Sequence, residues 1–105
     1  MVIDFQPEAA NKLKEIHAYY KEKSELAADK ILSDIYDALL PLKTFPQMAA
    51  IESLLSDAPV TFRSLIVRSM FKVIYFIDED RDVINIATIW DCRQDDRKMR
   101  AEVLG

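Results

Sequence analysis

Hydrophobic residues recur along this chain with two different periods. Between residues 7 and 42 they return every three or four positions, which is typical of helices that bury one face. The first stripe consists of Ala9, Leu13, Ile16 and Tyr20, and the second of Ala27, Ile31, Ile35, Ala38 and Leu42. The pattern therefore predicts two helices, at about 7–23 and 25–42, that are close enough in sequence to form a hairpin.

The regions around these helices also carry local signals. Pro7 fits the first turn of a helix, where its missing N–H costs little, and Ser24 can cap the second helix. Pro41 should kink or end that helix near its last turn. Residues 1–5 alternate weakly between apolar and polar side chains and predict a short strand. Residues 43–59 follow no regular pattern and predict either a short helical turn or a loop that packs on the core.

From residue 60 onward the chain contains three runs rich in β-branched and aromatic residues. The runs cover 60–68, 71–78 and 83–91, and only short polar breaks separate them. Connections this short force neighbouring strands to be antiparallel, so the pattern predicts a three-stranded meander. The predicted fold class is α+β, with an N-terminal strand and a helical hairpin packed on an antiparallel sheet. The meander supplies the last three strands, and a short basic tail follows it.

The predicted register rests on two tight turns. A two-residue turn at Ser69-Met70 pairs Arg68 with Phe71, and the second turn pairs Ile86 with Tyr75 and Trp90 with Phe71. One face of the meander then carries only apolar residues and should lie under the helices. A slip of one residue would exchange the two faces.

In this register the other face is exposed and mixed in character. Arg63, Lys72 and Arg93 are its cations. They stand above an apolar floor that consists of Leu65, Ile74, Phe76 and Ile89. A partly apolar exposed face usually binds a partner, so this face is the first candidate for a functional surface. The three cations also have a plain structural interpretation, as strand charges that keep the sheet from aggregating.

Composition places the chain among small globular proteins. It has 105 residues, half of them hydrophobic, and a single cysteine, so we expect one domain over residues 1–105. No apolar run is long enough to span a membrane and no signal pattern appears, which predicts a cytoplasmic protein. The net charge of −4 excludes a generic nucleic-acid binder. Every arginine nevertheless lies within residues 59–105.

Cofactor and metal chemistry find little support in the sequence. His17 has no second histidine or nearby cysteine, so it cannot build a zinc site from strong ligands. The acidic run 78–82 lacks the glycine and ligand spacing of an EF-hand and is typical of a solvated turn. Cys92 fits a structural cysteine better than a nucleophile. We therefore expect no cofactor and no metal.

Four short segments carry a more specific signal. They are Phe5-x-Pro7-Glu8-Ala9, Phe62-Arg63-Ser64-Leu65, Phe71-Lys72-Val73-Ile74-Tyr75 and Asp91-Cys92-Arg93-Gln94. In order and spacing they resemble the RelE/ParE family of bacterial toxins, the toxin halves of type II toxin–antitoxin or plasmid-stabilisation modules. The resemblance spans almost the whole chain. It implies a RelE/ParE-like fold and a small toxin that a wrapping antitoxin neutralises.

The resemblance leaves two activities open. RelE-type members cut messenger RNA on the ribosome with basic residues of the sheet and often a tyrosine in the tail. Arg63, Lys72 and Arg93 match the basic positions and are the candidate catalytic residues, but Leu65 and Met99 replace a further basic residue and the tyrosine. ParE-type members inhibit DNA gyrase and lack that catalytic set. The sequence is closer to ParE, which makes it more similar to a non-enzymatic toxin.

Two sets of binding residues follow from the resemblance. The target-binding set, against DNA gyrase or alternatively the ribosome and its mRNA, is Arg63, Lys72, Asp91, Arg93 and Gln94. The antitoxin-binding set is Leu65, Ile74, Phe76 and Ile89. An mRNA interferase and an inactive relic that only binds its antitoxin remain as alternatives. We expect no membrane partner and no direct DNA binding by the toxin alone.

Overall fold

One five-stranded mixed sheet with the strand order β1-β5-β4-β3-β2 organises the chain. A computed structural model describes residues 1–105. The strands are β1 (Val2–Phe5), β2 (Ala50–Ile51), β3 (Phe62–Val67), β4 (Phe71–Asp78) and β5 (Val83–Asp91). β1 pairs with β5 in parallel, and all other pairs are antiparallel. The predicted N-terminal strand and meander are confirmed, whereas the short edge strand β2 was not expected.

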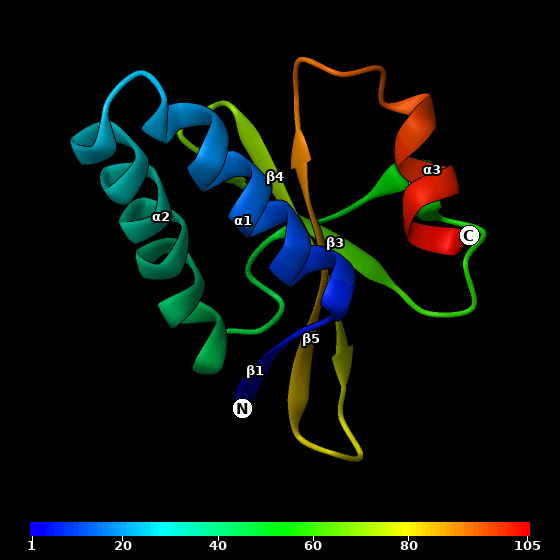
Figure 1. Cartoon of the computed structure of the whole chain (residues 1–105). Helices are drawn as coiled ribbons and strands as arrows, with labels where there is room; N and C mark the ends of the chain where they lie inside the picture. Colours follow the sequence, from blue (N-terminus) through cyan, green and yellow to red (C-terminus); the bar gives the residue numbers. More distant parts are fainter.

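The predicted helical hairpin is also present and covers one face of the sheet (Figure 1). It consists of α1 (Pro7–Lys21) and α2 (Glu25–Leu39). The hydroxyl of Ser24 caps α2 by accepting a hydrogen bond from the backbone N–H of Ala27 at 3.2 Å. α2 then gives way to a 3₁₀ turn, η1 (Leu40–Lys43), whose second residue is a proline. No helix of the structure combines the length and apolar character needed to cross a membrane.

Two hydrophobic cores lie on opposite faces of the sheet. The inner core packs beneath the hairpin and takes Val73 and Tyr75 from β4. The outer core lies beneath η2 (Ser53–Leu55) and a C-terminal helix, α3 (Arg97–Leu104), which Figure 1 shows apart from the hairpin. Its buried members are Leu55, Phe62, Ile74, Trp90 and Met99. The tail, expected only as a basic segment, is therefore a helix that covers the second face.

The predicted turn between β3 and β4 was wrong by one residue. Three residues form this turn, so Val67 pairs with Phe71, and Arg68 has no partner on β4. Arg68 and Ser69 adopt positive φ angles of 58° and 55°. Residues other than glycine rarely take this conformation. Because the turn contains no glycine, the sequence pattern did not indicate it.

The shifted turn exchanges the two faces of β3. Arg63 pairs with Tyr75 and therefore lies on the hairpin side of the sheet. Phe62 is buried as expected, but in the outer core, and Ile66 points outward with 61% of its surface exposed. The predicted face that combined Arg63 with Lys72 does not exist.

A bulge in β5 changes the second half of the meander. Tyr75 pairs with Ile86 as predicted, but the register shifts by one residue immediately afterwards. Trp90 consequently lies opposite Lys72 and not opposite Phe71. Trp90 is a core residue, as expected, but it belongs to the outer core.

Candidate target-binding groove

A groove of about 610 Å³ runs between α1 and the C-terminal end of β5. Helix α1 contributes Lys12, Glu15, Ile16, Tyr19 and Tyr20, and the sheet with its following turn contributes Phe71, Ile89, Asp91, Arg93 and Gln94. Three of the five predicted target-binding residues, Asp91, Arg93 and Gln94, thus come together here. We term this the strand-end groove and regard it as the candidate functional site.

Backbone hydrogen bonds fix the turn that carries Arg93. The N–H of Cys92 donates to the carbonyl of Met70 at 2.8 Å and extends the β4–β5 ladder by one bond. The N–H of Gln94 donates to the carbonyl of Asp91 at 3.0 Å, and the N–H of Arg93 donates to the Asp91 carboxylate at 2.9 Å. The turn therefore holds both charged side chains at one end of the groove.

Asp91 and Arg93 form a close ion pair. Arg93 Nε lies 3.0 and 3.2 Å from the two carboxylate oxygens of Asp91, and Nη2 lies 2.6 Å from Oδ2. The hydrogen bond from Arg93 lowers the pKa of Asp91, although partial burial opposes it, and Asp91 in turn raises the pKa of Arg93. The guanidinium of Arg93 therefore lies in the groove already paired with a carboxylate of the chain itself.

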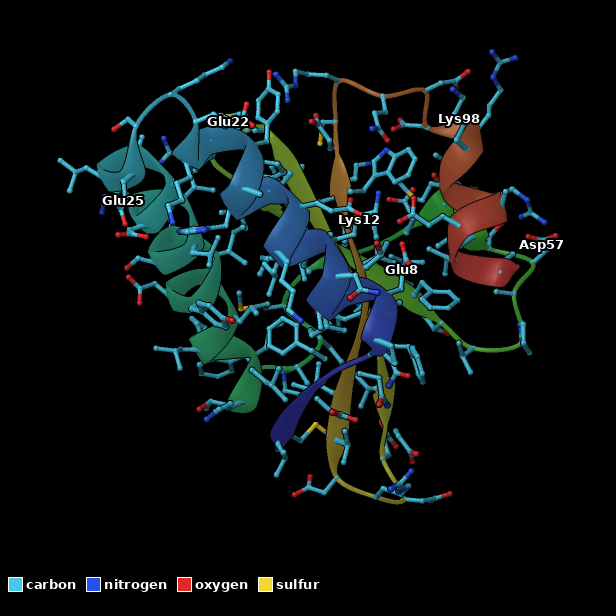
Figure 2. The ribbon with its side chains drawn as sticks, viewed as in Figure 1. Glu8, Lys12, Glu22, Glu25, Asp57 and Lys98 are labelled. Atoms are coloured by element: carbon cyan, nitrogen blue, oxygen red, sulfur yellow. The ribbon has the colours of Figure 1, made fainter.

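The second cation of the groove, Lys12, is balanced as well. Its Nζ lies 3.2 Å from Glu102 Oε1 on α3 and 5.9 Å from the centroid of the Trp90 ring. Figure 2 shows Lys12 between α1 and α3. Glu102 also accepts a hydrogen bond from Thr88 at 3.0 Å, which ties α3 to β5. Lys12 therefore connects three elements of the fold.

Two adjacent tyrosines form the aromatic wall of the groove. The rings of Tyr19 and Tyr20 meet edge to face with centroids 5.0 Å apart. Lys23 Nζ donates to Tyr19 Oη at 3.2 Å. This hydrogen bond and the charge of Lys23 lower the pKa of Tyr19, and the charge of Arg93 lowers it further. The hydroxyl of Tyr20 is buried and has no hydrogen-bond partner within the chain.

Sequence reasoning missed this wall. It assigned Tyr20 to the buried stripe of the first helix and gave Tyr19 no role. Consecutive residues of an α-helix point about 100° apart, so both rings cannot face the same core. The sequence signal for this wall was therefore the presence of two adjacent tyrosines at the end of an apolar stripe.

Arg63 lies elsewhere on the hairpin side. Its Nη1 donates to the carbonyls of Ala49 at 2.8 Å and Gln47 at 3.3 Å, which fastens the segment before β2 to β3. Its partner Tyr75 is four residues from Phe71 along β4. At about 3.3 Å per residue, this separates Arg63 from the strand-end groove by about 13 Å.

Lys72 lies on the outer face of the sheet. Its Nζ is 3.2 Å from Glu52 Oε2, and Glu52 is only 6% exposed. Burial opposes the charge of Glu52, but hydrogen bonds from Ser64, Lys72 and the N–H of Leu54 outweigh it, so the pKa of Glu52 is lowered. Lys72 thus anchors the segment that leads into η2.

The predicted arrangement of the cations on one face is therefore wrong. Arg63 and Lys72 lie on opposite faces because the β3–β4 turn is one residue longer than expected. Of the three predicted cations, only Arg93 reaches the strand-end groove. The structure brings Asp91, Arg93 and Gln94 together and leaves Arg63 and Lys72 apart from them.

The predicted apolar floor is also absent. Ile74 and Ile89 are 0% and 1% exposed and belong to different cores. Leu65 packs against the inner core, and Phe76 packs against the outer core. The antitoxin-binding role predicted for these four residues has no common exposed surface to support it.

Two further side chains have clear surroundings. Cys92, expected to be structural, is exposed, and partial desolvation raises its pKa, which disfavours a nucleophilic thiolate at neutral pH. His17 Nε2 lies 2.8 Å from Asp29 Oδ1 across the hairpin. No group of three histidine, cysteine, aspartate or glutamate side chains is arranged to hold a metal ion.

The helical hairpin over a five-stranded sheet defines a small α+β domain of the RelE/ParE-like class. A solved structure from the chromosomal ParDE toxin–antitoxin system of P. aeruginosa has the same fold, with a TM-score of 0.70 and 22% sequence identity. The alignment covers 87% of this chain and 95% of that one.

Sequence comparison identifies the family directly. The family model for the ParE toxin of type II toxin–antitoxin systems (parDE) matches residues 3–96. The chain belongs to the ParE toxin family. A search of curated protein sequences finds no significant match. The family and fold predicted from the sequence are confirmed, and α3 lies beyond the matched residues.

Proposed function

We propose that this ParE-type toxin inhibits DNA gyrase by binding it through the strand-end groove, and that a cognate antitoxin neutralises it. Membership of the ParE toxin family supports both parts of the proposal. Since gyrase acts on the bacterial chromosome, the proposal places the toxin in the cytoplasm. The toxin would act as a binding protein and not as a nuclease.

The contacts of the three candidate cations support a binding protein over a nuclease. A ribonuclease stabilises the charge that develops on the scissile phosphate with donors that are positioned and free in advance. Here Arg93 is engaged by Asp91, Lys72 is engaged by Glu52, and Arg63 is bound to backbone carbonyls. They are also divided between two faces of the sheet. This arrangement disfavours a phosphate site and favours a protein target.

The strand-end groove has features of a protein-binding surface. Tyr19 is 49% exposed and stands next to Arg93, whose side chain is 59% exposed. Tyrosine and arginine are enriched among the residues that dominate protein interfaces.

A supercoiling assay tests the proposal. Purified, antitoxin-free toxin should inhibit supercoiling by gyrase, and addition of the antitoxin should restore it. Toeprinting on translating ribosomes should reveal no toxin-dependent cleavage of mRNA. A folded toxin that leaves gyrase fully active contradicts the proposal, and one that only binds its antitoxin would be a relic.

One observation favours the mRNA endoribonuclease as a second candidate. Tyr19, with its lowered pKa, lies in the same groove as Arg93, and a tyrosine of this kind can act as a general base. Met99, at the position of the family's tail tyrosine, is buried in the outer core and cannot take that role. Codon-specific cleavage that disappears in Tyr19→Phe and Arg93→Ala would establish the enzyme and refute our choice.

A further inference from the structure

The C-terminal helix α3 is held on the outer core by few apolar contacts. Met99 is its one fully buried side chain, and Val103 packs there while only partly buried. Its other contacts are polar and come from Arg100 and Glu102. A short terminal element that buries so little apolar surface can open separately from the rest of a fold.

Arg100 provides the first polar contact. Its guanidinium pairs with the carboxylate of Asp57, with Nη2 2.9 Å from Oδ2, and Nη1 donates to the carbonyl of Leu54 at 3.1 Å. Figure 2 shows Asp57 beside α3. The hydrogen bond from Arg100 lowers the pKa of Asp57. This contact therefore persists from neutral to mildly acidic pH.

Glu102 provides the second polar contact, and another carboxyl group faces it. Lys12 Nζ lies 3.2 Å from Glu102 Oε1, and the hydroxyl of Thr88 donates to the same oxygen at 3.0 Å. Glu8, one turn before Lys12 on α1, also reaches Glu102. Figure 2 shows Glu8 and Lys12 between α1 and α3. We term Glu8 and Glu102 the carboxyl pair.

The strength of the carboxyl pair depends on its protonation. A hydrogen bond with Glu102 raises the pKa of Glu8, and burial and the charge of Glu102 raise it further. On α1, Lys12 opposes this shift and Glu15 adds to it. Lys98, one turn before Glu102 on α3, forms no ion pair with it. Because two carboxylates repel and a shared proton joins them, the contact is stronger when Glu8 is protonated.

A buried donor without a partner also lies in the outer core with α3. Trp90 is the only tryptophan of the chain, is 1% exposed, and shares this core with Met99. Its Nε1–H is buried and has no hydrogen-bond partner. A donor in this state is unfavourable, and opening of α3 would give it water. The docked helix is therefore opposed by this orphan donor and, at neutral pH, by the carboxyl pair.

We propose that α3 opens separately from the rest of the fold and that the carboxyl pair makes its docking strongest at mildly acidic pH. At neutral pH both members are ionised, and only Lys12 offsets their repulsion. At mildly acidic pH Glu8 takes up a proton and donates a hydrogen bond to Glu102, while Arg100 still holds Asp57. α3 is thus a pH-dependent cover of the outer core. This inference does not depend on the proposed function.

The sign of the pH dependence follows from two opposite shifts. The pKa of Glu8 in the folded chain lies above its unfolded value, about 4.3, so its stabilising contribution is complete below that value and is lost as the pH rises through the folded pKa. The pKa of Asp57 is lowered, so its contribution is lost only as the pH falls through that lower value. Docking is therefore strongest between the two.

Hydrogen exchange of the Trp90 indole N–H tests the proposal in the wild-type chain. Because only burial shields this proton, its exchange, measured by NMR relative to N-acetyltryptophanamide at the same pH, reports opening of α3. Its protection should be at least threefold greater at about pH 5 than at about pH 7.5. The backbone amides in the centre of β4, which report global unfolding, should be protected more strongly at both pH values. Equal protection at the two pH values, or an indole protected as strongly as β4, would overturn the inference.

Two glutamine variants distinguish the carboxyl pair from a general effect of acid. Glu8→Gln removes the charge but keeps a donor for Glu102, so its indole protection at about pH 7.5 should rise at least threefold and lose its dependence on pH. Glu22→Gln is the matched control, because it changes the same residue type at the opposite end of α1, where Figure 2 shows it far from α3. The control should behave like wild type. A Glu8→Gln protein that keeps the wild-type pH dependence would refute the role of the pair.

The titration of Glu8 gives a second test that leaves α1 unchanged. Carboxyl chemical shifts should show that Glu102→Gln lowers the pKa of Glu8 toward its ordinary value. Glu25→Gln, which changes a residue on α2 away from α3, should leave that pKa where it is in wild type. If the pKa of Glu8 is the same in Glu102→Gln as in wild type, the two carboxyl groups are not in contact and the inference is wrong.

Discussion

Two grooves flank α1 but hold their charges differently. One is the strand-end groove, and the other, which we term the hairpin groove, lies where α1 meets α2 beside β1. In the strand-end groove, Arg93 and Lys12 are already engaged by carboxylates of the chain itself. Lys14 and Lys21 line the hairpin groove, and neither forms an ion pair within the chain. A partner of the first groove therefore gains little from charge and must recognise shape and aromatic contacts, whereas the lysines of the second are free to attract carboxylates.

The position of α1 between the two grooves has a consequence for neutralisation. Its residues alternate between them with the helical period, so the two linings share no residue. A helix seated in the hairpin groove would leave the strand-end groove uncovered on the other side of α1. An antitoxin that neutralises target binding by direct cover therefore needs a second segment that passes around the helix, as a wrapping partner would provide.

The largest expected effect separates two arginines with the same local geometry. Arg93 pairs with Asp91 in the strand-end groove, and Arg97 pairs with Asp95 through the same three contacts outside it. Arg93→Ala should raise the toxin concentration needed to inhibit gyrase at least tenfold, because exposed arginines beside aromatic residues dominate interfaces. Arg97→Ala should leave it unchanged.

The supercoiling assay measures both variants against wild type. Equal losses would mean that the strand-end groove is not the target-binding surface. Equal retention of activity would lead to the same conclusion, provided that both proteins are folded by circular dichroism.

Salt should distinguish the two grooves with a smaller effect. Raising the ionic strength from about 0.05 to 0.5 M shortens the range of charge interactions severalfold. If the antitoxin contacts the free lysines Lys14 and Lys21, its binding should weaken severalfold over this range. Gyrase inhibition through the internally paired groove should change less. Calorimetry and a gyrase binding assay at the same salt concentrations measure the two interactions. Equal weakening of both would contradict this comparison.

The buried hydroxyl of Tyr20, which has no hydrogen-bond partner, predicts a gain in stability without a change in target binding. A buried hydroxyl without a partner is unfavourable, so Tyr20→Phe should raise the free energy of unfolding by up to about 1 kcal/mol. Tyr75→Phe is the opposite control, because Tyr75 Oη donates to the carbonyl of Pro46 at 2.6 Å and its loss should destabilise by about 1 kcal/mol. Urea denaturation measures both changes.

The same Tyr20→Phe variant should inhibit gyrase like wild type, because the buried hydroxyl is out of reach of a bound target. A variant that is less stable than wild type, or that inhibits gyrase more weakly, would show that this hydroxyl does have a hydrogen-bond partner, in the chain or in the target.

Much of the fold was predictable because it follows from the periodic spacing of hydrophobic residues along the chain. The helical stripes, the Ser24 cap and the three β-rich runs were each local signals, and the bounds of β4 and β5 were predicted correctly. β2 was missed because two residues are too few to display a period. The helix α3 was missed because only Met99 of its turns is fully buried, so its apolar stripe is faint.

The candidate site was predictable only in part, for a specific physical reason. Asp91, Arg93 and Gln94 are adjacent in sequence, so they stay together whatever the register. Arg63 and Lys72 belonged to the same predicted site only through the length of one turn. Arg68 and Ser69 take up positive φ although neither is a glycine, so the sequence did not reveal the length of this turn. One additional turn residue places Arg63 and Lys72 on opposite faces of the sheet.

The smallest expected effect is a change in the acid titration of Asp91. The hydrogen bond from Arg93 is the main cause that lowers the pKa of Asp91, so Arg93→Ala should raise that pKa toward its ordinary value. Asp95, whose pKa is lowered by Arg97, should titrate unchanged in this variant. Lys14→Ala should shift neither aspartate, because no carboxylate pairs with Lys14. Carboxyl chemical shifts in an NMR titration follow each aspartate separately.

The sign of the linked stability change follows from the direction of the shift. Because the pKa of Asp91 is lower in the folded chain than in the unfolded chain, about 3.9, the pair with Arg93 stabilises the fold above that value. This contribution is lost as the pH falls through the lower, folded pKa. Acidification should therefore destabilise wild type slightly more than Arg93→Ala. An Asp91 pKa that does not move in Arg93→Ala would mean that the pair is open in solution, and the contrast between the two grooves would disappear.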